Sequence, residues 1–141
     1  MSYYYGDIKM SFDGRLDILR ELPEVLEQWK NSMDKLSQEA KSEIETMIQR
    51  LNKELKQVEK VSAEEQGEVS LEYFSDLVTV PVAGLCEIAR KRPEVIINAE
   101  GTFSDSITDE SCEYAFFSDS GEISLEGEES MDDYFLEQLE Y

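Results

Sequence analysis

The amino-acid sequence predicts an α+β fold: a mostly antiparallel sheet of four to five strands with helices on one face, plus one long amphipathic helix. Three observations lead to this prediction. The chain has 141 residues, which fits a single domain with a hydrophobic core. Apolar residues recur at helical spacing early in the chain, whereas short alternating segments crowd into its second half. The resulting order, β-α-β-α-β-β-β-α, is most simply a variant of the ferredoxin-like sandwich.

The chain opens with a strand at residues 3–12, where apolar and polar residues alternate. Asp13 and Gly14 indicate a turn after this strand. Residues 15–22 carry enough apolar positions for one or two helical turns. Pro23 then suits the first turn of the next helix, where its missing N–H costs nothing.

The long amphipathic helix is expected at residues 24–60, which contain no Gly and no Pro after Pro23. One continuous helix would be about 55 Å long, whereas a domain of this size has a radius of gyration of about 14 Å. Two alternatives follow: an uninterrupted helix, which the pattern favours, and a hairpin broken near residues 37–42. Ser42 and Glu45 have capping-box spacing there. The apolar stripe consists of Leu26, Trp29, Met33, Leu36, Ala40, Ile44, Met47, Leu51, Leu55 and Val58.

The second half of the chain reads as short strands around one short helix. A helix follows Pro81 and ends at a basic triplet before Pro93, and Gly101 marks a bulge or bend in the strand after it. Strands near 112–117 and 122–126 form a hairpin. The single domain 1–141 therefore divides into a strand (1–14), a helical region with the long helix (15–60), a linker (61–68), an acidic sheet region with a short helix (69–129) and a C-terminal helix (130–141).

The net charge is −20, from 33 acidic and 13 basic residues, and it is unevenly spread. Residues 1–66 hold 10 bases and 14 acids, whereas residues 67–141 hold 3 bases and 19 acids. Such a surface repels nucleic acid and anionic membranes and attracts basic protein surfaces. No apolar run reaches the length that spans a bilayer, and the N-terminus has no signal-peptide pattern, so we expect a cytoplasmic protein.

The sequence offers no catalytic constellation, and we expect no enzymatic activity. It has no histidine, the usual general base and metal ligand at neutral pH, and its glycines stand singly rather than in a phosphate-binding loop. Cys86 and Cys112 match no metal or redox spacing, so free thiols are expected. Acids within 105–110 or 119–129 could bind calcium, but neither segment has EF-hand spacing. We therefore favour solvated carboxylates and expect no metal and no cofactor.

Acids in the second half alternate with apolar residues such as Tyr114, Phe116 and Ile123. Strands would hold these carboxylates on a folded surface, where they can stand in for phosphates, which lie at one charge per about 1.7 Å of duplex axis. This pattern makes the acids candidate ligands of a basic partner. The candidate partner-binding residues are Asp105, Asp109, Glu110, Glu113, Asp119, Glu122, Glu126, Glu128, Glu129, Asp132 and Asp133.

The chain resembles small phage-encoded anti-defence proteins in its small size, its lack of histidine, its charge of −20 and its base-free segment 93–141. This class includes anti-CRISPR and anti-restriction inhibitors, several of which mimic DNA. The resemblance covers mainly residues 93–141 and rests on composition and layout rather than on a motif. It implies a stoichiometric inhibitor in the host cytoplasm. Its partner would be a basic nucleic-acid-binding protein or nuclease complex, and it would bind neither nucleic acid nor membrane.

The alternative function is a structural or adaptor protein that uses the helix at 24–60 as its interface. Part of the apolar stripe would then pack on the protein's own sheet, and the rest would dock a partner helix or a second copy in a homodimer. Salt distinguishes the two functions. A complex made by an acidic face weakens steeply with ionic strength, whereas one made by an apolar helix does not.

Overall fold

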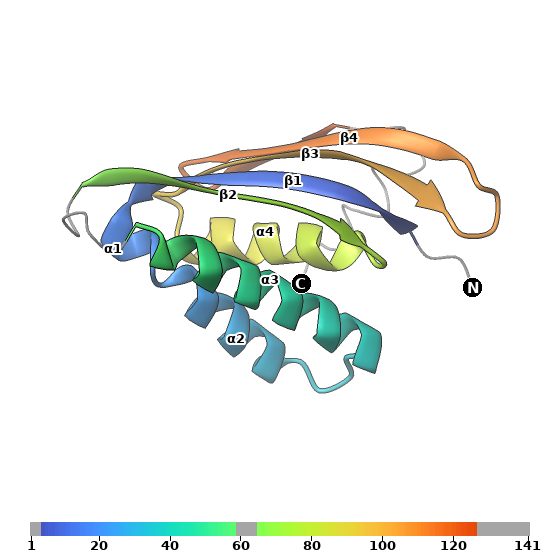
Figure 1. The fold of residues 1–141 in the computed structure, drawn as a ribbon, viewed down its shortest axis with the longest axis horizontal. Helices are drawn as coiled ribbons and strands as arrows, with labels where there is room; N and C mark the ends of the chain where they lie inside the picture. The colour runs from blue at the N-terminus through green and yellow to red at the C-terminus, as the bar shows by residue number, and fades with distance from the viewer. Residues whose placement is uncertain (1–3, 59–64, 127–141) are drawn as a thin grey trace.

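The computed structural model describes residues 4–58 and 65–126 and confirms the α+β fold (Figure 1). An open five-stranded sheet carries the helices on one face. The helix expected at 130–141 lies outside the described residues. In chain order the elements are β1 (Tyr4–Arg15), α1 (Leu16–Leu19), α2 (Leu22–Ser32), α3 (Gln38–Lys56), β2 (Gln66–Ser75), α4 (Thr79–Lys91), β3 (Ile96–Asp105), β4 (Ser111–Asp119) and β5 (Glu122–Glu126).

The strands lie in the order β2-β1-β3-β4-β5, and every neighbouring pair is antiparallel. β1 therefore separates β2 from β3, which run parallel to each other and are joined by α4. β3, β4 and β5 continue as a meander. The β4–β5 hairpin turns through Ser120 and Gly121, which both have positive φ (53° and 82°), as tight two-residue hairpin turns favour.

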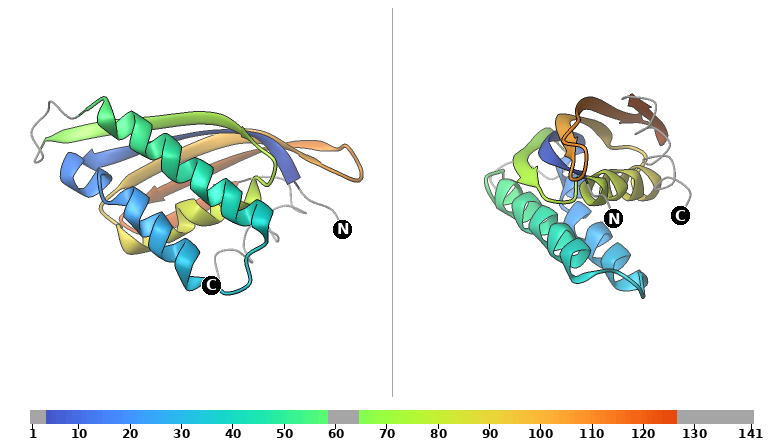
Figure 2. Two further views of the ribbon diagram at one scale, coloured as in Figure 1. Left: turned by 60° about the horizontal axis from the view of Figure 1, so that its bottom comes forward. Right: turned by 90° about the vertical axis from the view of Figure 1, so that its right-hand side faces the viewer.

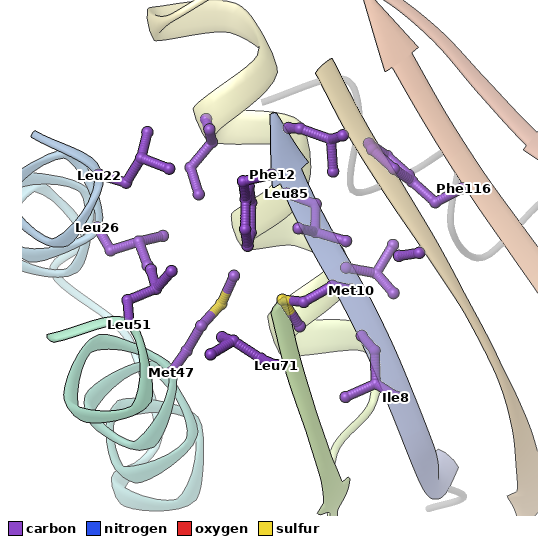
Figure 3. Close-up of a cluster of buried hydrophobic side chains, with 14 of the residues drawn as sticks. Ile8, Met10, Phe12, Leu22, Leu26, Met47, Leu51, Leu71, Leu85 and Phe116 are labelled. Atoms are coloured by element: carbon purple, nitrogen blue, oxygen red, sulfur yellow. The ribbon is translucent and has the colours of Figure 1, made fainter. Parts of the chain in front are cut away.

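The core fills the space between the sheet and the helices. α3 packs under β2, α4 packs under β3, β4 and β5, and α2 packs against both of these helices (Figure 2). Ile8, Met10 and Phe12 of β1 point into the same buried cluster as Leu26 of α2 and Met47 of α3 (Figure 3). The apolar side chains of the alternation predicted for the first strand thus face the core, as expected.

α4 is the most deeply buried helix of the described chain, since all residues from Pro81 to Ala89 are buried. A helix that is apolar nearly all round belongs inside a domain rather than on its surface. Its last turn carries Arg90 and Lys91, which face the negative end of the helix dipole. Within the described ranges, no helix combines the length and the apolar character needed to cross a membrane.

The uninterrupted helix favoured for residues 24–60 is wrong, and the hairpin alternative is confirmed. α2 ends at Ser32, and α3 begins after Ser37, whose Oγ accepts a hydrogen bond from the Ala40 amide at 3.1 Å. Ser42 and Glu45 form no cap because both lie inside α3. The hairpin lets both halves of the apolar stripe face one core, which a straight helix of about 55 Å could not do in a domain of this size.

Two element boundaries and one expected bulge also differ from the sequence-based expectation. β1 continues through Asp13 and Gly14, where a turn was expected, because β2 is long enough to pair with both. β2 correspondingly begins inside the expected linker. Gly101 forms no bulge, since its pairing with both neighbouring strands is unbroken. A Cβ at Gly101 would lie 2.0 Å from the carbonyl oxygen of Asp7, so glycine allows a close approach of β3 to β1.

Candidate functional site

One face of the sheet carries no helix in the described part of the chain (Figures 1 and 2). Side chains alternate along each strand, so every second residue points to this surface, which we call the outer face. Its side chains are exposed or half-buried. The outer face comprises Tyr5, Asp7, Lys9, Ser11, Asp13 and Arg15 of β1, Gln66, Glu68, Ser70, Glu72 and Phe74 of β2, Ile96, Asn98, Glu100, Thr102 and Ser104 of β3, Ser111, Glu113, Ala115, Phe117 and Asp119 of β4, and Glu122, Ser124 and Glu126 of β5.

The outer face is strongly acidic. Nine of its described side chains are carboxylates, and two are basic, Lys9 and Arg15. Arg15 lies at the end of β1 and makes an ion pair with Asp17 at 2.8 Å. Lys9 lies opposite Glu72 on one neighbouring strand and Glu100 on the other. Towards β4 and β5 the face has no basic side chain among the described residues.

The strand register sorts the outer face into rows that run across the strands, and each row is named here after its β1 residue. The Asp7 row and the Asp13 row lie nearer the two ends of the strands, with the other two rows between them. The Asp7 row is Phe74, Asp7, Thr102 and Glu113; the Lys9 row is Glu72, Lys9, Glu100, Ala115 and Glu126; the Ser11 row is Ser70, Ser11, Asn98, Phe117 and Ser124; and the Asp13 row is Glu68, Asp13, Ile96, Asp119 and Glu122. In the Asp13 row, Ile96 and Asp119 lie one residue beyond the last β3–β4 pair, Ile97 and Ser118.

The outer face is hollowed where small side chains gather. One hollow of about 500 Å³ lies over the Ser11 and Lys9 rows, and a second of about 570 Å³ lies over the Lys9 and Asp7 rows. Both are open to solvent and are lined partly by Glu100, Ala115 and Glu126. Phe117 is the large side chain of the Ser11 row and is 43% exposed. The arrangement is a shallow, open surface rather than an enclosed small-molecule pocket.

The crowding of carboxylates has an electrostatic consequence at Asp13. Partial burial raises the pKa of Asp13 above its usual range, and the negative charge and hydrogen bond of the neighbouring Glu68 raise it further. Asp13 and Glu68 lie directly opposite each other on β1 and β2. Like charges in this position destabilise a sheet by about 0.2–1 kcal/mol per pair. A cation placed over the pair would relieve that repulsion.

The structure brings four of the predicted binding residues onto the outer face: Glu113, Asp119, Glu122 and Glu126. All four are exposed, as alternation with the buried Tyr114 and Phe116 requires. They occupy the β4–β5 side, where no described base interrupts them. Glu128, Glu129, Asp132 and Asp133 lie outside the described residues.

The other three predicted residues lie in the loop between β3 and β4. Asp105 is half-buried, and its Oδ1 accepts hydrogen bonds from the amides of Ile107 (2.8 Å) and Thr108 (3.3 Å), so it shapes the loop. Asp109 and Glu110 are exposed, and Asp109 accepts a hydrogen bond from the Tyr5 hydroxyl at 3.4 Å. These residues therefore lie at one end of the sheet, beyond the Asp7 row.

Sequence reasoning missed five carboxylates of the outer face, all on β1, β2 and β3. The charge imbalance along the chain drew attention to residues 93–141, whereas the fold places β1 beside β3 and β2 on the far side of β1, in the same sheet. The alternation of the first strand already separated acids from core residues, but only the strand order shows that these acids share a face with the β4–β5 hairpin. The missed residues are Asp7, Asp13, Glu68, Glu72 and Glu100.

Many of the basic residues lie on the helical side instead, where several pair with acids. Lys30 contacts Glu27 at 2.9 Å and Glu45 at 3.4 Å, and Arg92 contacts Glu21 at 3.4 Å. The two faces of the protein thus differ in charge balance. The outer face has an unbalanced negative field, and the helical side has a mixed surface of the ordinary kind.

The described residues show no sign of a metal or redox centre. No group of three or more Cys, Asp or Glu side chains among them is placed to hold a metal ion. Cys86 and Cys112 are not joined in a disulfide, as their spacing predicts. Burial raises the pKa of the Cys86 thiol to about 12, so this side chain is a poor nucleophile.

Comparisons with protein families, with curated proteins and with solved structures find no match to this chain. The geometry and charge of the outer face are therefore the basis for a functional conclusion.

Proposed function

We propose that the protein is a non-enzymatic inhibitor that binds a basic nucleic-acid-binding protein or nuclease complex through its outer face. The observation that carries the proposal is the concentration of nine carboxylates against two basic groups on a sheet face that no helix of the described residues covers. Soluble surfaces ordinarily mix both signs. A face in which negative charge predominates, built on five paired strands, instead presents a fixed negative field to a partner.

The physical basis is mimicry of a phosphate backbone. A nucleic-acid-binding surface is lined with Lys and Arg, which neutralise the phosphates and release the counterions condensed on the nucleic acid. Carboxylates on strands about 4.8 Å apart present such an array without a nucleic acid. The field also steers a basic partner towards this face and raises the association rate at low salt. Anti-CRISPR and anti-restriction inhibition are the functions this mechanism suits.

The helix-interface alternative receives no comparable support. The apolar stripe that was to dock a partner is largely buried in the protein's own core, including Ile44, Met47 and Leu51 of α3 and Leu26 of α2. These side chains meet the sheet and α4 rather than solvent. A homodimer through residues 24–60 remains a prediction of the sequence, but the described structure offers few apolar side chains for it.

The test measures DNA cleavage by purified CRISPR effector complexes and restriction nucleases, with the protein added up to stoichiometric amounts. We expect at least one of these nucleases to be inhibited by the native protein. The same nuclease should keep its activity with the triple variant Glu113→Lys, Glu122→Lys and Glu126→Lys, whose positions are all exposed.

A matched control reverses three exposed or half-exposed acids outside the outer face: Asp34→Lys, Glu54→Lys and Glu94→Lys. It changes the net charge by the same amount and should inhibit as the native protein does. Failure of every nuclease to respond would refute the proposal. Equal loss of inhibition in both variants would show that net charge, rather than the outer face, is responsible.

A further inference from the structure

The Ser11 row runs across the sheet between two acidic rows, and this arrangement specifies more than a negative surface. Serine and asparagine side chains form most of the row, so its floor is low. The Lys9 row and the Asp13 row lie on either side and carry most of the carboxylates, with Glu72, Glu100 and Glu126 in the first and Glu68, Asp13, Asp119 and Glu122 in the second. The hollow of about 500 Å³ over this floor is bounded by Glu68 from one acidic row and by Glu100 and Glu126 from the other.

We call the groove over the Ser11 row, between the Lys9 row and the Asp13 row, the trough. Its dimensions follow from strand geometry. The two acidic rows are four residues apart along each strand, which is about 13 Å at 3.3 Å per residue. Five strands at about 4.8 Å spacing make the trough about 19 Å long. An α-helix with its side chains is about 10–12 Å across, and about 13 residues of helix cover 19 Å.

The same proportions occur in duplex DNA. The major groove is about 12 Å wide, admits an α-helix, and is bordered by negative charge on both sides. DNA-binding proteins place a recognition helix there, with basic residues towards the borders. In the described rows the two walls of the trough hold seven carboxylates and one ammonium group, Lys9.

We propose, building on the proposed function, that the partner element bound by the outer face is a basic α-helix that lies across the strands along the Ser11 row. Its Arg and Lys side chains reach the carboxylates of the two walls, where Arg can pair with both oxygens of a carboxylate. Phe117 on the floor offers the helix one apolar or stacking contact. The preferred partners are thus proteins that read DNA with a helix.

The experiment uses the whole protein and two fluorescent 14-residue peptides, measured by anisotropy in 50 mM salt. The first peptide is an Ala/Arg/Leu helix that carries one Lys and one Glu four residues apart, whose side chains are condensed into a lactam bridge, with arginines on both sides of one leucine. The second has the same charge and two central prolines, which prevent a helix. We expect the helical peptide to bind at least tenfold more tightly than the broken peptide.

A variant that fills the trough without changing its charge provides the specific test. Asn98→Trp raises the floor at the centre of the Ser11 row, and this residue is exposed. It should weaken binding of the helical peptide at least tenfold and change binding of the broken peptide less than threefold. The matched control, Thr102→Trp, lies on the same strand and face but in the Asp7 row, and should bind as the native protein does. If Asn98→Trp does not fold, Ser124→Trp on the edge strand replaces it.

The outcomes separate this inference from the proposed function. Equal affinity for both peptides, or no effect of the filling variants, would overturn the helix trough while the acidic face still binds cations. An equal loss in both tryptophan variants would place binding elsewhere on the face and also overturn it. If neither peptide binds, the inference fails, and if the triple charge reversal also leaves nuclease inhibition unchanged, the proposed function fails with it.

Discussion

Leu51 of α3 distinguishes a core role of the helix stripe from an interface role. Its side chain is 0% exposed and belongs to the cluster that joins the sheet to the helices. Leu51→Ala removes three carbon atoms, whose burial is worth about 2.4 kcal/mol at about 0.8 kcal/mol per CH₂. The cavity left behind adds to this, and buried leucine-to-alanine changes cost about 2–5 kcal/mol in total.

For a chain of this length, each kcal/mol lowers Tm by about 4 °C, so Leu51→Ala should lower Tm by about 8–20 °C. Circular dichroism melts give Tm, and sedimentation gives the mass of the native protein and the variant. The control is Asn52→Ala, one residue further along α3 and exposed, which should change Tm by no more than about 2 °C. An unchanged Tm for Leu51→Ala, with or without loss of an oligomer, would refute the core assignment.

Three further predictions follow from single residues. The pKa of Asp13 is raised in the folded chain, so between its usual pKa of 3.8 and the raised pKa the folded chain holds a proton that the unfolded chain releases. The contribution of this group to stability is therefore greatest below pH 3.8 and is lost as pH rises through the raised pKa. Asp13→Asn should therefore raise the free energy of unfolding at pH 7 by up to about 1 kcal/mol, and urea melts that show a decrease would contradict the repulsion with Glu68. Gly101→Ala should lower the free energy of unfolding by about 1–3 kcal/mol, because its Cβ would lie 2.0 Å from the Asp7 carbonyl oxygen. The control is Gly14→Ala: the nearest atom to a Cβ at Gly14 is 3.7 Å away, so its stability should be within about 1 kcal/mol of native. Cys86 is 1% exposed. In a Cys112→Ser background it should therefore react with a thiol reagent only as fast as the protein unfolds, and rapid labelling in native buffer would disprove its burial.

Local patterns predicted the elements of the fold better than their ends. The alternation of Ile8, Met10 and Phe12 identified the first strand and its core face, because side-chain period is a local property. The extent of that strand was not local: Asp13 and Gly14 stay in β1 because β2 offers them partners. The same limit applies to the helix break, since Ser37 became the N-cap only because both helices pack on one core.

The candidate site was predictable in part for the same reason. Glu113, Asp119, Glu122 and Glu126 follow from the β4–β5 hairpin, whose strands are neighbours in sequence. Asp7, Glu72 and Glu100 join them only through the strand order, which brings distant segments side by side. A charge count along the chain could not show this, because it records position in sequence rather than position on a face.

The most direct test of the acidic-face mechanism is the salt dependence of competition with DNA. For a nuclease that the protein inhibits, its affinity is measured by displacement of labelled DNA at salt concentrations from 50 to 200 mM. We predict that the logarithm of affinity falls linearly with the logarithm of salt concentration, and that the slope is markedly smaller for the triple variant at Glu113, Glu122 and Glu126. An affinity that stays constant over this range, or a slope that the triple variant leaves unchanged, would contradict binding through the outer face.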